Sequence, residues 1–62
     1  MVGFQTKNST YYVDQVNKTI TGGYFGDAIV PYTHLQVIIG CKAIIKLFDG
    51  RVVNTGLVRN YI

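Results

Sequence analysis

Asp49-Gly50 constrains the fold of this chain more than any other dipeptide, because it stands between two apolar runs, 42–48 and 51–57. Asp-Gly in that setting is typical of a β-hairpin with a two-residue type I′ turn, in which both central residues need positive φ. The turn sets the register, which predicts that Leu47 faces Val52. We therefore expect a hairpin in the last third of the chain.

The remaining strand signals are short runs of β-branched and aromatic residues, and the chain has two alanines and no glutamate to favour helices. A three-residue loop after the first run would place Phe4 opposite Tyr12, a favourable aromatic pair. Pro31 lacks an N–H, so the segment around it is expected outside the central strands. A helical turn over 27–32 is one option there. The expected strands cover residues 2–6, 10–14, 19–21, 34–39 and 58–62, besides the hairpin.

A chain of 62 residues with this pattern is expected to form one domain over residues 1–62. A sheet of five or six short strands has to curl to bury its face and its edges. We therefore predict an all-β fold, a small, partly open SH3-like barrel. An OB-like barrel, or a meander sheet completed by dimerisation, is the alternative.

The chemistry-bearing residues are too few to predict catalysis. The single cysteine, Cys41, cannot form an internal disulfide, and Cys41 with the single histidine, His34, cannot build a structural zinc site. Cys41 is expected to be a buried thiol and His34 to be partly exposed. Asp49 belongs to the predicted turn, and the glycines of 22–26 match no phosphate-binding motif. We expect neither an enzyme nor a cofactor.

One face of the predicted hairpin is the candidate binding surface. Alternation assigns Ala43, Ile45, Leu47 and Val52 to the core. The opposite face mixes cations with apolar groups, which a purely solvated face rarely does. Three interpretations stay open: both faces are partly covered and only the cations reach water, the face is a protein interface or homodimer contact, or it binds nucleic acid. Tyr11 is added because adjacent tyrosines at 11 and 12 point to opposite sides of a strand. The candidate binding residues are Lys42, Ile44, Lys46, Phe48, Arg51, Val53 and Tyr11.

The expected partners follow from charge and composition. The net charge of +3 permits an acidic protein or nucleic acid. The longest uncharged stretch, 28–41, is too short to span a bilayer, so no membrane association is expected. No secretion signal is recognised in the first ten residues, and secreted domains of this size usually carry several disulfides. We therefore expect a cytoplasmic protein that binds a protein partner or its own copy.

Residues 6–14, Thr6-Lys7-Asn8-Ser9-Thr10-Tyr11-Tyr12-Val13-Asp14, are followed by Lys18-Thr19-Ile20 and, later, by Asn54-Thr55-Gly56-Leu57-Val58. This pattern resembles short all-β proteins of Gram-positive bacteria and their phages, which carry a Ser-x-Tyr-x-x-Asp type strand early and a Thr-x-x-Val strand late. The resemblance covers most of the chain. It implies no activity, and it implies a bacterial or prophage origin.

Overall fold

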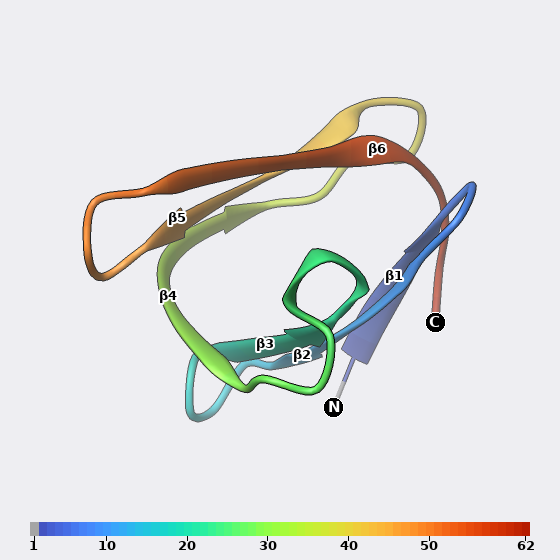
Figure 1. Ribbon diagram of the computed structural model, residues 1–62. Coiled ribbons are helices and arrows are strands. Elements are labelled where there is room, and N and C mark those ends of the chain that lie inside the picture. Colours follow the sequence, from blue (N-terminus) through green and yellow to red (C-terminus); the bar gives the residue numbers. More distant parts are fainter. Residues whose placement is uncertain (1) are drawn as a thin grey trace.

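The computed structural model describes residues 2–62 and shows a small all-β domain whose six strands form a closed hydrogen-bonded ring (Figure 1). Every strand pairs antiparallel with the next one along the chain, and the last pairs with the first. The expected partly open barrel is therefore corrected to a closed ring, which needs no second copy to complete it. The strands are β1 (Val2–Thr6), β2 (Thr10–Asp14), β3 (Thr19–Gly22), β4 (Val30–Gln36), β5 (Lys42–Leu47) and β6 (Val52–Tyr61).

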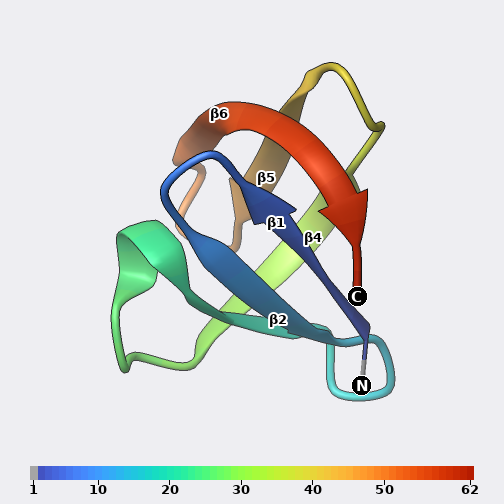
Figure 2. The same ribbon diagram turned by 90° about the vertical axis from the view of Figure 1, so that its right-hand side faces the viewer.

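The ring is uneven, because two long strands pass between its two layers. β4 pairs with β3 through only two residues, Val30 and Pro31, and then continues along β5. β6 pairs with β5 in its first part and with β1 from Val58 onward. Figure 2 shows β6 curving from one layer to the other. One layer therefore consists of β1 to β3, and the other of β4, β5 and the first part of β6.

The core lies between these layers and takes side chains from all six strands. Period-two alternation places one side of each strand inward, so that β2 buries Tyr11 and Val13 and leaves Tyr12 exposed. On β5 the expected core residues are confirmed. The buried hydrophobic residues are Phe4, Tyr11, Val13, Ile20, Tyr32, Ala43, Ile45, Leu47 and Val58.

The β5–β6 hairpin is confirmed, but its turn differs from the expected one. The Leu47 N–H donates to the Arg51 carbonyl at 2.9 Å, and the Gly50 N–H donates to the Leu47 carbonyl at 3.1 Å. The loop therefore has three residues, and among them only Gly50 has positive φ, at 90°. This is a turn with glycine in the left-handed position rather than a type I′ turn. The register shifts by one residue, so Val52 points outward and Val53 packs against the core.

The β1–β2 hairpin also differs by one residue, but here the loop is shorter than expected. The Thr6 N–H donates to the Ser9 carbonyl at 2.9 Å, so the loop has two residues and Phe4 faces Tyr11 rather than Tyr12. The expected aromatic pair forms with this other tyrosine. The Phe4 and Tyr11 rings stack with their centroids 4.8 Å apart.

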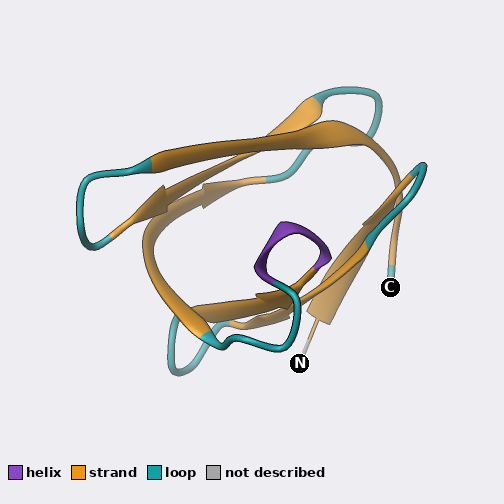
Figure 3. Ribbon diagram, in the orientation of Figure 1, coloured by secondary structure: helices purple, strands orange, loops and turns teal. Residues whose placement is uncertain are grey.

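The central segment departs furthest from expectation. β4 includes Pro31, begins four residues before the predicted strand and ends at Gln36, so the apolar residues 37–39 lie in the following loop. Pro31 is accommodated because it is the second residue of the strand, where β4 has just begun to pair with β3. The helical turn is η1 (Gly23–Phe25) instead of 27–32 (Figure 3). The expected last strand is the end of the continuous β6.

Candidate functional site

The outer side of the β4–β5–β6 layer carries the expected cationic and apolar side chains. The register sets Lys46 between His34 on β4 and Val52 on β6, and sets Lys42 beside Leu57. Ile44 lies in the same strand between the two lysines and is half-buried. We call this surface the basic face. It consists of His34, Lys42, Ile44, Lys46, Val52 and Leu57.

The basic face is open to solvent, and its charge is of one sign. Val52 is 52% exposed and Leu57 is 57% exposed, and both lysines are exposed. The three aspartates of the chain lie elsewhere: Asp14 is the last residue of β2, in the other layer, while Asp27 and Asp49 lie in loops. Within residues 2–62 the basic face thus holds lysines and aliphatic groups without a carboxylate. Of the apolar residues expected on this face, Ile44 and Val53 are half-buried and Phe48 is 69% exposed, so the interpretation in which these groups are partly covered stays open.

Phe48 and Arg51 lie at the tip of the β5–β6 hairpin, beside the basic face. Phe48 is 69% exposed. The Arg51 Nε donates to Asp49 Oδ2 at 2.7 Å, and its backbone N–H donates to Oδ1 at 3.0 Å. These hydrogen bonds, the backbone one first, hold the pKa of Asp49 below its usual value. The tip therefore presents an exposed aromatic ring next to a guanidinium that is paired with the Asp49 carboxylate.

Tyr11 and Val53 do not belong to the exposed surface. Tyr11 is only 3% exposed, and its hydroxyl accepts the Tyr24 N–H at 3.1 Å. Val53 is half-buried against the core because of the register shift. The outward positions are taken by Tyr12 and Val52, their neighbours in sequence. A one-residue change in pairing exchanges the two faces of a strand, which accounts for both corrections.

The residues considered for chemistry are joined by no hydrogen bond and no metal-ligand grouping within residues 2–62. Cys41 is exposed in the β4–β5 loop, contrary to the buried thiol expected, and no hydrogen bond joins it to His34 within the described residues. Asp14 accepts the N–H groups of Val16 and Asn17, and the hydrogen bonds from Asn17 above all lower its pKa. Within residues 2–62, no three His, Cys, Asp or Glu residues are grouped as metal ligands would be.

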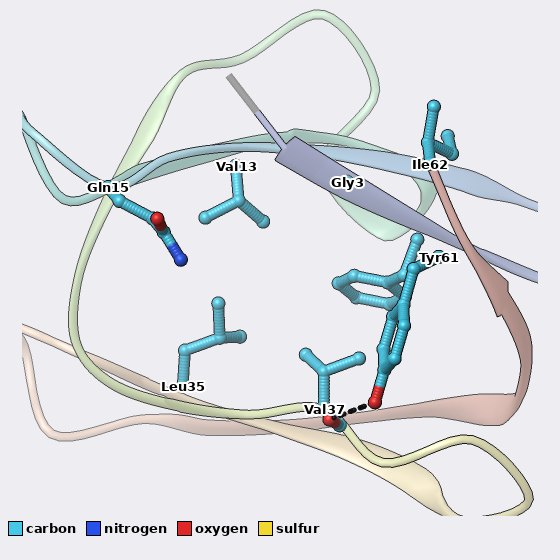
Figure 4. A pocket seen from close by; sticks show the side chains of 8 residues that line it. Gly3, Val13, Gln15, Leu35, Val37, Tyr61 and Ile62 are labelled. Atoms are coloured by element: carbon cyan, nitrogen blue, oxygen red, sulfur yellow. Dashed lines mark hydrogen bonds between the residues drawn. The ribbon is translucent and has the colours of Figure 1, made fainter.

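A cleft at one end of the ring is a second candidate, and the sequence did not predict it (Figure 4). Its volume is about 460 Å³. Tyr61 forms one wall, and its hydroxyl donates to the Val37 carbonyl at 3.0 Å. We call it the mouth cleft. Its lining residues are Gly3, Phe4, Val13, Gln15, Leu35, Val37, Tyr61 and Ile62.

Comparison with known proteins assigns no family. No family model, curated protein or solved structure matches this chain. The resemblance to short proteins of Gram-positive bacteria and phages stays a prediction. Across the described part of the chain, no helix has the length and apolar character needed to cross a membrane. The basic face and the mouth cleft are therefore the two surfaces from which a function is inferred.

Proposed function

We propose that this chain is a non-catalytic binding or adaptor module, of the SH3-like small-barrel kind, that acts through its basic face on a protein partner. The observation that carries the proposal is the pairing of exposed Val52 and Leu57 with exposed Lys46 and Lys42 across adjacent strands. Exposed aliphatic groups gain free energy when they leave water, at about 25 cal/mol per Å². Cations at the border of such a patch select and orient the partner.

The sign of the charge distinguishes between an unlike partner and a second copy of the chain. A two-fold dimer through the basic face would bring the same surface of two chains together. Lys42 and Lys46 would then face positive charge without a carboxylate to compensate it. A partner with acidic groups around an apolar centre fits this face better than the homodimer does.

Nucleic acid binding is the second candidate, and Phe48 is the observation that favours it. An aromatic ring exposed at a hairpin tip can stack on a base, which is worth about 1–3 kcal/mol per base. The lysines of the basic face would then contact phosphates. Such binding weakens steeply as salt rises.

A cytoplasmic setting is part of the proposal. Cys41 is an exposed free thiol. Thiols of this kind persist in reducing compartments, whereas oxidising compartments convert them to disulfides.

The test uses two double variants that change the net charge equally. Lys42→Glu/Lys46→Glu reverses the basic face, and Lys7→Glu/Lys18→Glu reverses exposed lysines in turns of the other layer. Peptides selected from a displayed random library against the native chain are expected to combine acidic and apolar residues. Their affinity should fall at least tenfold for the first variant and stay within twofold for the second.

Three results decide between the alternatives. Equal loss of peptide affinity in both variants would show a mere effect of net charge and would refute the basic face as the site. If the library yields no binding peptide, and a dT12 or rU12 oligonucleotide causes salt-sensitive amide shifts at Phe48, nucleic acid is favoured. A dimer at millimolar concentration, dissociated only by the Lys42→Glu/Lys46→Glu variant, would favour self-association.

A further inference from the structure

The two ends of the ring are closed differently. At one end η1 folds over the interior: Phe25 meets the edge of Tyr11 with centroids 6.4 Å apart, and the Tyr24 N–H bonds to the Tyr11 hydroxyl. Figure 2 shows η1 on one side and the C-terminal end of β6 on the other. That second end has no such covering segment within the described residues, and the mouth cleft lies there.

The floor of the mouth cleft belongs to the hydrophobic core. Phe4 is 1% exposed and Val13 is 2% exposed, so both rest on the packed core. Phe4 is held by stacking on Tyr11, which η1 holds from the other end. Because close-packed interiors relax little, the cleft cannot close by a shift of its floor.

The walls of the mouth cleft belong to different layers, which keeps them apart. Leu35 and Val37 come from β4 and the loop after it, and they face Val13 on β2 and Gln15 in the turn after β2 (Figure 4). β3 and β4 pair only through residues near the start of β4, so the two layers diverge beyond that point. The cleft is the space that this divergence leaves.

The residues that line the mouth cleft are mainly apolar, with two polar side chains and no charged side chain among them. The Tyr61 O–H already donates to the Val37 carbonyl, so the phenol oxygen can only accept a hydrogen bond from a ligand. Gln15 is exposed at the rim, where its amide can donate and accept. A charged ligand would lose hydration here without a charged side chain of the lining to pair with, which is costly.

We propose that the mouth cleft binds a small, uncharged, mainly apolar molecule that carries one or two polar groups. Leu35, Val37 and the Tyr61 ring would surround its apolar body, and the Gln15 amide and Tyr61 oxygen would bind a hydroxyl or amide of the ligand. Its volume of about 460 Å³ lies within the range of about 300–1,000 Å³ that is typical of small-molecule sites. At roughly 30 Å³ for each water displaced, it would hold a ligand of about 15 non-hydrogen atoms.

This site is separate from the basic face, so the two proposals can fail independently. None of the basic-face residues lines the mouth cleft. The Lys42→Glu/Lys46→Glu variant is therefore expected to bind small neutral probes as the native chain does.

The test is a titration of the native chain with 2-naphthol, followed by amide shifts, with 2-naphthoate and 2-naphthylmethylammonium as charged counterparts. We expect saturable shifts at Gly3, Gln15 and Val37, and at least tenfold weaker binding of both charged probes. Absence of saturable shifts up to the solubility limit of 2-naphthol would refute the proposal. The proposal would also be refuted if the selected peptides, and not 2-naphthol, shifted the amides of these residues.

Two matched variants locate the binding. Val37→Trp fills the mouth cleft and should abolish the shifts, whereas Ile39→Trp adds the same side chain to an exposed position in the same loop, outside the lining. Equal binding by both variants would refute the site. If Val37→Trp does not fold, as shown by the loss of amide dispersion in its NMR spectrum, Gln15→Trp replaces it. This variant blocks the cleft from its exposed rim and should likewise abolish the shifts.

Discussion

Gly23→Ala tests how closely η1 rests on the core. Gly23 has φ of +47°, and a Cβ built there would lie within 2.6 Å of three carbon atoms of the Tyr11 ring. The ring cannot move aside, because Phe4 stacks on one face and Phe25 meets its edge. One methyl group would therefore force either η1 off the ring or Tyr11 out of its packing.

The expected loss has two parts. An L-residue in left-handed backbone costs about 1–2 kcal/mol, and overpacking of a core typically costs about 1–3 kcal/mol. The free energy of unfolding should fall by about 2–5 kcal/mol in all. A domain of this length has a stability of roughly 3–9 kcal/mol, so the variant would lose a large share of its free energy of unfolding.

Gly50→Ala is the matched control, because Gly50 also has positive φ but its Cβ would meet no atom within 4 Å. It should lose only the backbone part, about 1–2 kcal/mol. Urea denaturation followed by circular dichroism measures both variants, with the slope m unchanged if the native state keeps its compactness. A difference between the variants below about 0.5 kcal/mol, well under the expected overpacking cost, would refute the contact between η1 and Tyr11.

Three further substitutions test single hydrogen bonds. Thr55→Val should lower the free energy of unfolding by about 1–3 kcal/mol in urea, because the Ala43 N–H loses its buried acceptor, the Thr55 hydroxyl at 3.1 Å; an unchanged midpoint would contradict this. Tyr11→Phe should cost about 0.5–1.5 kcal/mol and speed amide exchange at Tyr24, whose acceptor it removes. The pKa of Asp49 is lowered by folding, so its stabilising effect is present above about pH 4 and is lost as pH falls through the lower folded pKa. Asp49→Asn should therefore flatten stability against pH in that acid range, measured by thermal unfolding.

Alternation along strands was predictable where pairing on both sides reinforces it. β5 is paired with β4 and with β6, and its inward positions were all identified. The turn was harder, because Asp-Gly suits both a type I′ turn and a three-residue loop with Gly in the left-handed position. Hydrogen bonds from Arg51 to the Asp49 carboxylate accompany the second form. That choice moved Val52 outward and Val53 inward.

The run of Val37, Ile38 and Ile39 misled the prediction for a different reason. Its composition favours a strand, but strand formation depends on partners, and β4 finds them earlier, on β3 and β5. The two isoleucines are consequently half exposed in a loop. Likewise the mouth cleft depends on where β4 leaves β3, which no local pattern encodes. Cys41 is exposed because it lies in this same loop.

The placement of apolar side chains separates what folding requires from what remains available to a ligand. The ring closes through β1 and β6, and every strand contributes a side chain to the core. Val52 and Leu57 add nothing to that core, since they point away from it. Polar residues at those outward positions would satisfy the same strand pairing. The basic face thus lies outside the demands of the fold, whereas the mouth cleft shares Phe4 and Val13 with the core and can be altered only at its walls and rim.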